Sequence, residues 1–183
     1  MQHELATPRR HAESGLTLAE MLVTLAVLGI LAAVALPSLS DLLARRRLDG
    51  AATEYLNHLQ WARQQAVQLN RKVRLKLGAG GPHSCYVFYT GAADNCQCNA
   101  QGARCTDPSQ LLLAVALRPS DGVSLSTPSA GAGLLIDPLR GTVSPAMTTV
   151  FSAGQAAVHQ ITNIMGRTRS CSPAPPVLGL PAC

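Results

Sequence analysis

The chain has 183 residues, of which 47% are hydrophobic, 14% are charged and only 3% are aromatic. This length allows one domain of ordinary size with an attached segment and excludes two, and so few aromatic residues argue against a deep aromatic ligand pocket. The formal net charge of +5 favours an anionic partner such as nucleic acid or a membrane surface. No acidic residue follows Asp137, so the C-terminal quarter is basic.

The first predicted element is an apolar helix over residues 16–36, LTLAEMLVTLAVLGILAAVAL. Its length suffices to span a membrane. Two arginines lie in residues 1–15, which by the positive-inside rule keeps that end in the cytoplasm and exports the rest. The single charge of the helix is Glu20, a functional candidate because a carboxylate in lipid is costly without a partner. The plain alternative is a single-pass anchor with an incidental glutamate near the interface.

The junction Gly15-Leu16-Thr17-Leu18-Ala19-Glu20 resembles the prepilin peptidase site of type IV pilins and type II secretion pseudopilins, with Leu16 where phenylalanine is usual. The resemblance implies that prepilin peptidase removes residues 1–15 as a leader, cutting between Gly15 and Leu16, and methylates the new amino group. It also implies that the inner membrane holds the helix before assembly. In a filament with other pilins, Glu20 would then pair with the N-terminal amine of a neighbouring subunit.

An amphipathic continuation of the helix is predicted over residues 37–70, with a kink at Pro37. Apolar residues recur there at spacings of mainly three and four, which predicts one buried face. They are Leu39, Leu42, Leu43, Leu48, Ala51, Tyr55, Leu56, Leu59, Ala62, Ala66 and Leu69. The arginines at 45–47 are interpreted as a solvated face or, alternatively, as contacts with lipid headgroups or neighbouring subunits.

After Asn70 the apolar period becomes two, which predicts a β-rich head over residues 71–170. The expected fold class is α+β, with a small antiparallel sheet packed on the C-terminal half of the long helix. Turn residues separate the expected strands. These strands cover residues 71–77, 85–89, 111–117, 123–125, 134–136, 148–151 and 157–164.

All six cysteines lie beyond residue 80, which predicts disulfides formed in an oxidising compartment. Cys171 and Cys183 bracket a proline-rich tail, and a disulfide between them would stabilise it by about 3 kcal/mol. Three pairings are open for the remaining four cysteines. These are Cys85, Cys96, Cys98 and Cys105. A zinc site that includes His83 is the alternative, which the Cys-x-Cys spacing and export both disfavour.

Two C-terminal segments, GLLIDPLRGT at 133–142 and GRTRSC at 166–171, resemble the minor pilins of the FimT and FimU kind and the related GspH pseudopilin domain, most closely FimT. The resemblance implies that Arg167 and Arg169 bind DNA, because DNA-binding FimT-type pilins carry a Gly-Arg-x-Arg motif near the C-terminus. On a strand these two residues would face the same way and engage successive phosphates. Alternatively, both hydrogen-bond the tail or a neighbouring pilin. Candidate extensions of this surface are Arg71, Lys72, Arg74 and Lys76.

The expected function is that of a non-catalytic minor type IV pilin, in or near the pilus tip, that binds double-stranded DNA without sequence preference during natural transformation. The alternative is a structural minor pilin or a type II secretion pseudopilin that primes filament assembly without binding DNA. The head would lie in the periplasm and, after assembly, on the cell-surface pilus. No cofactor, metal or catalytic residue is expected, and His58 and His159 are interpreted as structural or solvated.

Overall fold

The computed structural model describes residues 17–78, 84–99, 102–107, 110–129, 133–173, 177 and 179–183, without the side chains of residues 34–38. The chain divides into two units, Met1–Ser40 and Asp41–Cys183. A helix, α1, covers Leu18–Leu69. It begins after Thr17, whose Oγ1 accepts a hydrogen bond from the backbone N–H of Glu20 at 3.3 Å, as an N-cap residue does.

The first unit contains the predicted membrane segment. Its described apolar side chains are exposed, from Leu18 to Leu31. Within the described residues, no helix combines the length and the mean hydropathy of a membrane span. Gly15 and Leu16, the predicted processing site, lie outside the described residues, as do the side chains of residues 34–36.

The part of α1 in the second unit buries one face. Its buried residues follow one another at spacings of four and three, which places them on one side of a helix. They are Leu48, Ala52, Tyr55, Leu59, Ala62 and Ala66. Leu42, Leu43 and Leu69, which the sequence places on the same face, are exposed. The helix ends at Leu69, and Asn70 follows with a left-handed φ of 47°.

The strands form two main antiparallel sheets and a small hairpin. The first sheet has the order β5-β2-β1-β7-β8, with β1 Val73–Gly78, β2 Cys85–Thr90, β5 Leu111–Ala116, β7 Gly133–Ile136 and β8 Val143–Ser144. The second has the order β11-β10-β9-β6, with β6 Ser124–Ser126, β9 Met147–Ala153, β10 Ala156–Thr162 and β11 Thr168–Cys171. The hairpin pairs β3, Cys96–Asn99, with β4, Gly102–Cys105, and a short 3₁₀ helix covers Pro119–Asp121.

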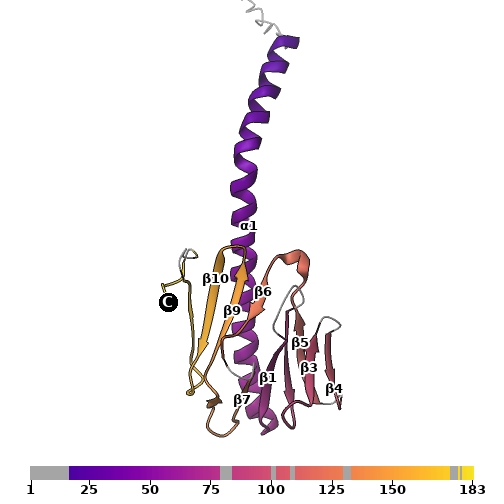
Figure 1. Cartoon of the computed structure of the whole chain (residues 1–183), viewed down its shortest axis with the longest axis vertical. Coiled ribbons are helices and arrows are strands. Elements are labelled where there is room, and N and C mark those ends of the chain that lie inside the picture. The colour runs from indigo at the N-terminus through magenta and orange to yellow at the C-terminus, as the bar shows by residue number, and fades with distance from the viewer. Residues whose placement is uncertain are drawn as a thin grey trace, which may run out of the picture. The chain divides into compact units, whose positions relative to one another are not determined.

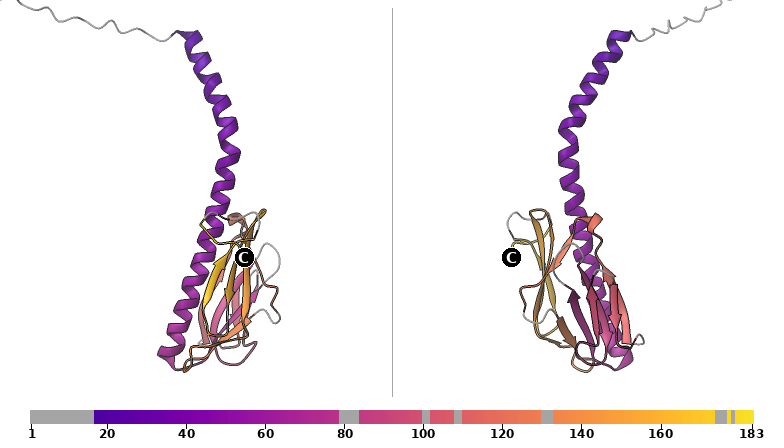
Figure 2. Two further views of the ribbon diagram at one scale, coloured as in Figure 1. Left: turned by 90° about the vertical axis from the view of Figure 1, so that its left-hand side faces the viewer. Right: turned by 45° about the vertical axis from the view of Figure 1, so that its right-hand side comes forward.

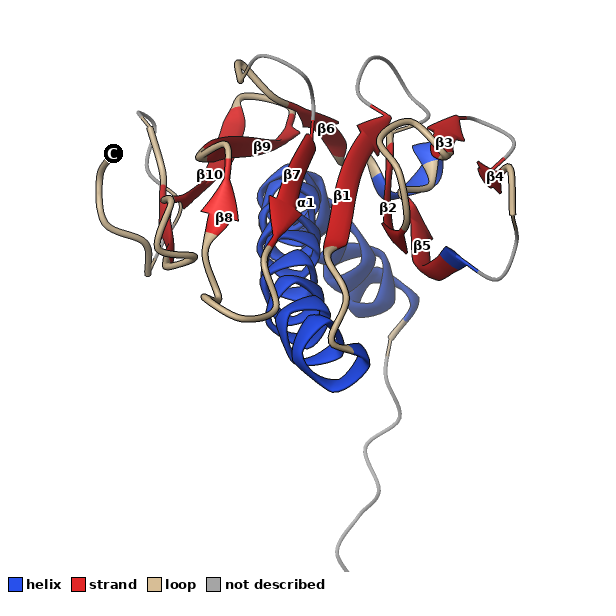
Figure 3. Cartoon of the chain, turned by 90° about the horizontal axis from the view of Figure 1, so that it is seen from below, coloured by secondary structure: helices blue, strands red, loops and turns tan. Residues whose placement is uncertain are grey.

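Both main sheets pack on the same half of α1 and share one core with it. Figure 1 shows the second sheet and the first sheet next to each other along the helix, and Figure 2 shows the helix and strand layers from the side. Seen from below in Figure 3, the strands make one curved layer. The fold class is therefore α+β with a helix on an antiparallel sheet, as predicted.

Tyr55 joins the helix to both sheets. Its ring lies 5.3 Å from that of Tyr86 on β2 and 5.4 Å from that of Phe151 on β9, measured between centroids. Its hydroxyl hydrogen-bonds Thr149 Oγ1 at 3.0 Å, and burial raises the Tyr55 pKa. The chain has few aromatic residues, and it concentrates these three at the junction of its layers, where large rings bury the most area.

The strand predictions need three corrections. The last predicted strand, 157–164, ends at Thr162, and a turn at 163–167 leads into β11. Arg167 therefore lies just before a strand, whereas Arg169 lies within one. The hairpin β3–β4 was not predicted because its strands are short, polar and cysteine-rich, so they lack an alternating apolar pattern. The strand β8 was not predicted because it has only two residues.

The structure pairs the cysteines as Cys85–Cys98, Cys96–Cys105 and Cys171–Cys183. All six are therefore in disulfides, which leaves no thiolate for the zinc alternative. The first two bonds tie the hairpin β3–β4 to itself and to β2. The hairpin packs on Val87 and Tyr89, so β2 is buried on both faces.

Candidate functional site

The turn that joins β10 to β11 positions the two arginines of the C-terminal motif. Asn163 N–H donates to Arg167 O at 3.0 Å, and Gly166 N–H donates to Asn163 O at 2.9 Å. The Asn163 side chain closes the turn by accepting a hydrogen bond from Arg167 N–H at 3.0 Å. Gly166 has a φ of 73°, a conformation that glycine adopts without strain. The turn therefore fixes the direction in which β11 starts.

Arg169 faces away from α1. Its neighbour Ser170 donates to Gln160 Oε1 at 2.8 Å, and the Gln160 amide reaches the helix by donating to Ala52 O at 3.2 Å. Because successive residues of a strand point to opposite faces, Arg169 lies on the outer face. Arg169 is paired across the strands with Ile161.

Arg167 and Arg169 border the same surface hollow of about 280 Å³, together with Ile161 and Asn163. Both arginines are exposed. Within the described residues, neither guanidinium takes part in an ion pair or a hydrogen bond. Two unengaged guanidiniums on one hollow are suited to bind an anion with several oxygens, such as a phosphate diester.

The C-terminal tail holds the other end of β11. The Cys171–Cys183 disulfide closes it, and the buried Ser172 hydroxyl donates to Ala157 O at 2.8 Å. The same hydroxyl accepts from Val177 N–H at 3.0 Å. His159 lies beside this disulfide, with its ring nitrogen and the two sulfurs within 4.8 Å of one another. Disulfide sulfurs are not thiolates, so these three residues do not make a metal site in this state.

Arg63 on α1 supports the turn from below, a role that the sequence did not indicate. Its guanidinium donates to Gly166 O at 2.8 Å and to Gly141 O at 3.3 Å. Gly141 belongs to the turn between β7 and β8, so one helix side chain joins two turns. A Cβ at Gly166 would lie 2.9 Å from Gly141 O and 3.0 Å from Arg63 Cζ, so only glycine fits there without a shift.

Comparison with known families identifies the family of this chain. The profile described as type II transport protein GspH matches residues 51–166, and the prokaryotic N-terminal methylation motif matches residues 10–36. The chain belongs to the GspH family. The methylation motif contains the predicted processing site and Glu20, and the GspH match ends one residue before Arg167. No match to a curated protein or to a solved structure was found.

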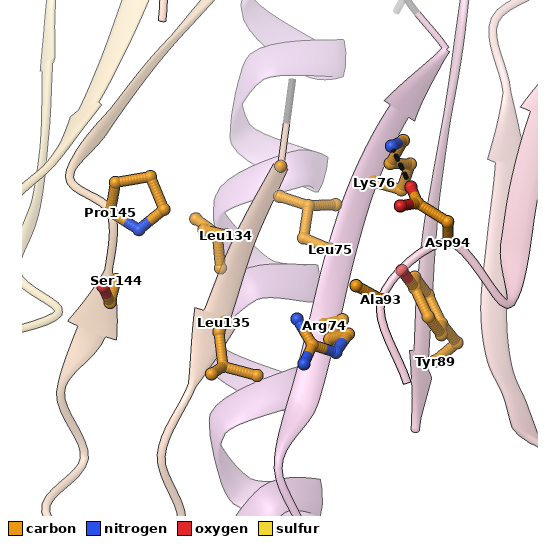
Figure 4. A pocket seen from close by; sticks show the side chains of 11 residues that line it. Arg74, Leu75, Lys76, Tyr89, Ala93, Asp94, Leu134, Leu135, Ser144 and Pro145 are labelled. Carbon is orange, nitrogen blue, oxygen red and sulfur yellow. Dashed lines mark hydrogen bonds and ion pairs between the residues drawn. The ribbon is translucent and has the colours of Figure 1, made fainter. Parts of the chain in front are cut away.

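A second group of cations lies on the outer face of the first sheet of this GspH-family head. These cations contact other residues of the head. Figure 4 shows Arg74 and Lys76 on β1, on the side away from the helix. Arg74 Nε donates to Gly91 O at 3.0 Å, and Lys76 Nζ forms an ion pair with Asp94 at 2.6 Å. The hydrogen bond and charge of Lys76 lower the Asp94 pKa. Arg74, Lys76 and Asp94 line a surface hollow of about 360 Å³, which Figure 4 shows.

The remaining predicted cations lie elsewhere. Arg71 and Lys72 are exposed and border a third hollow, beside Thr90 and Gln110. Backbone hydrogen bonds from Arg140 and Leu139 lower the Asp137 pKa, and the charge of Lys72 lowers it further. The four cations from Arg71 to Lys76 therefore do not share the hollow of Arg167 and Arg169.

The histidine on α1 has a structural setting. His58 Nδ1 hydrogen-bonds the Tyr86 hydroxyl at 2.8 Å in a half-buried position. Burial raises the Tyr86 pKa, and the charges of Glu54 and Tyr55 raise it further. The neutral Tyr86 hydroxyl and the His58 ring therefore link β2 to the helix. This contact supports the structural interpretation of His58.

Proposed function

We propose that this GspH-family chain is a minor type IV pilin of the FimT kind whose head binds extracellular double-stranded DNA for uptake in natural transformation. The observation that carries the proposal is the pair Arg167 and Arg169, exposed on one hollow and unengaged within the described residues. The proposed position is in or near the pilus tip, where incoming DNA is accessible. The role is non-catalytic.

The chemistry of the pair supports binding without sequence preference. Guanidinium groups match phosphate oxygens in shape and charge. Contacts with phosphates position a duplex but do not read its bases, which suits uptake of arbitrary DNA. The chain has no acidic residue after Asp137, so nothing in that stretch repels the backbone.

The test is a titration of the full-length protein in detergent with a fluorescent duplex of about 30 base pairs, repeated at several salt concentrations. Affinity should fall roughly tenfold or more across a several-fold rise in salt. In the variant Arg167→Gln/Arg169→Gln, affinity should fall about tenfold, and the slope of log affinity against log salt should shrink by about 2, because two phosphate contacts are lost.

Arg74→Gln/Lys76→Gln is the matched control, since it removes the same formal charge from cations that are already engaged. It should retain most of the affinity and most of the slope. The proposal fails if the two double variants bind equally well, or if the parent binds DNA without salt dependence.

The N-terminal segment is proposed to act in processing and assembly. Cleavage after Gly15 by prepilin peptidase and methylation of Leu16 would place Glu20 fifth in the mature chain, anchored in the inner membrane with the head in the periplasm. Glu20 is exposed in the first turn of α1, so it is accessible to the amine of a neighbouring pilin. Mass spectrometry of the mature protein should find an N-methylated Leu16, and an N-terminus beyond Leu36 would contradict the proposal.

A second candidate is a pseudopilin of type II secretion that contacts only other subunits. The description of the matched family, type II transport protein GspH, favours it. A deletion strain separates the two: loss of transformation with normal secretion supports the pilin, and loss of secretion with normal transformation supports the pseudopilin.

A further inference from the structure

Two turns lie next to each other at the end of the head where α1 ends, at the bottom of Figure 1. One is the turn 163–167 between β10 and β11. The other spans 137–142 between β7 and β8, where Gly141 N–H donates to Asp137 O at 2.9 Å. Asp137 Oδ1 accepts hydrogen bonds from Leu139 N–H at 2.9 Å and Arg140 N–H at 3.0 Å. Each turn is therefore closed by its own hydrogen bonds.

The two turns are also fixed to each other. Val143 N–H donates to Ile164 O at 2.9 Å, and Arg63 donates to a carbonyl oxygen in each turn. Gly166 also packs closely on Gly141, since a Cβ at Gly166 would lie 2.9 Å from Gly141 O. The backbone at the two tips is therefore held in place by contacts between the turns.

The tips expose apolar side chains. Leu139 is 84% exposed, Ile164 61% and Met165 63%. We call these three residues the apolar ridge. Single exposed apolar residues are ordinary, but among the large apolar side chains exposed on described strands and turns of the head, three of the four lie here, and the fourth is Leu111. Such a concentration on fixed turns indicates a contact surface.

The two turns of the apolar ridge also carry cations. Arg140 follows Leu139 in one turn, and Arg167 ends the other. The Asp137 carboxylate, the only acid in either turn, is engaged by backbone N–H groups within its own turn. From the ridge the positive charge continues along β11 to Arg169. A partner that complements this surface would carry regularly spaced negative charges with apolar clefts between them.

Double-stranded DNA has this chemistry, because phosphates line its grooves and stacked bases lie between them. Proteins that bind the minor groove insert Leu, Ile or Met between base steps and hold the flanking phosphates with arginine, which kinks the duplex. A protein partner with an acidic rim would also fit a ridge of this kind, but the two guanidiniums that border one hollow beside it match a phosphate diester more closely.

We propose that the apolar ridge is a wedge that inserts Ile164 and Met165 into the minor groove while Arg167 and Arg169 hold the phosphates. This inference rests on the proposed DNA binding and adds a bend to it. The bases are still not read, but pyrimidine–purine steps unstack most readily, so easily bent DNA with TA steps should bind more tightly than stiff A-tract DNA of equal length.

The experiment measures binding and bending of a duplex that carries a fluorescence donor and acceptor at its two ends, using the full-length protein in detergent. The parent should raise energy transfer as the ends approach. Ile164→Ser/Met165→Ser should lower the affinity by about fivefold and abolish the rise in energy transfer. Its salt slope should match that of the parent, because no charge is removed.

Leu111→Ser is the matched control, since Leu111 is 37% exposed on β5, at the opposite edge of the first sheet from β8. It should bind and bend DNA as the parent does. Parent-like binding and bending by the Ile164→Ser/Met165→Ser variant would overturn the wedge and leave DNA binding intact, provided Arg167→Gln/Arg169→Gln still loses affinity. If that ridge variant keeps DNA binding but no longer enters filaments, the ridge contacts another subunit and the wedge is also overturned.

Discussion

The outer faces of the two sheets both carry cations, but in different environments. On the first sheet, Arg74 donates to the Gly91 carbonyl and Lys76 is paired with Asp94. On the second sheet, Arg167 and Arg169 border one hollow and, within the described residues, have no ion pair or hydrogen bond. Each surface carries two of these cations, but Asp94 offsets one positive charge on the first sheet.

The difference shows that a count of cations does not locate an anion site. A phosphate that approaches Lys76 must compete with a carboxylate already at hydrogen-bonding distance, whereas a phosphate at the arginine pair displaces only water. The first surface uses its cations to hold the loop that contains Asp94 against β1. The second has no such internal use for its cations within the described residues, and Arg63 holds the turn before them through Gly166 O.

The largest expected effect comes from removing that support. Arg63→Met deletes hydrogen bonds to Gly166 O and Gly141 O, and hydrogen bonds from charged donors in part-buried sites contribute about 1.5–3 kcal/mol. The free energy of unfolding should therefore fall by about 2 kcal/mol in chemical denaturation of the full-length protein. DNA affinity should fall as well, because the turn before Arg167 loosens.

Arg74→Met is the matched control, since it removes one hydrogen bond at an exposed site on the first sheet. Its loss of stability should be well below that of Arg63→Met. Equal losses for the two variants would show that the turns are held by their own hydrogen bonds, and that Arg63 is dispensable.

A smaller effect is expected when the engaged surface is released. Asp94→Asn keeps the shape of the side chain but removes the charge that pairs with Lys76. If engagement is the reason this surface contributes little to DNA binding, affinity should rise about twofold, and the salt slope should grow by up to about 1, for one additional phosphate contact. An unchanged affinity and slope would instead mean that the first sheet lies out of reach of the bound duplex.

The sequence predicted the parts of the fold that depend on local periodicity. The stripe from Leu48 to Ala66 and most of the strands follow from spacings of three to four or of two. The tail disulfide was also predictable, because Cys171 and Cys183 close a short proline-rich loop. The pairing of the other four cysteines was not, because neighbours such as Cys96 and Cys98 are equivalent in sequence, and the fold alone separates their partners.

The motif in the sequence indicates Arg167 and Arg169 as a candidate site, but not what supports them. The predicted strand over 157–164 includes the first two residues of the turn before β11. Its hydrogen bonds depend on Asn163 and on contacts with Arg63, which lies 103 positions away from Gly166. Ile164 continued an apolar pattern that reads as strand, so its exposure at a turn tip required the three-dimensional structure.

The smallest expected effect is the response of two carboxylates to salt, Asp94 of the first surface and Asp137 of the turn that packs against the turn before β11. Hydrogen bonds from Arg140 N–H and Leu139 N–H lower the Asp137 pKa, and the hydrogen bond and charge of Lys76 lower that of Asp94. A folded-state pKa below the unfolded value of about 3.9 means that each contact stabilises the head above that pH and is lost as the pH falls through the folded pKa. Raising salt from about 0.05 M to about 0.5 M should move the Asp94 pKa upward, because an exposed ion pair is screened, and should shift that of Asp137 less, because its main partners are backbone N–H groups. Carboxyl ¹³C chemical shifts followed against pH at both salt concentrations would measure the difference, and an equal shift for both residues would show that the Asp137 turn depends on charge as much as the Lys76 pair does.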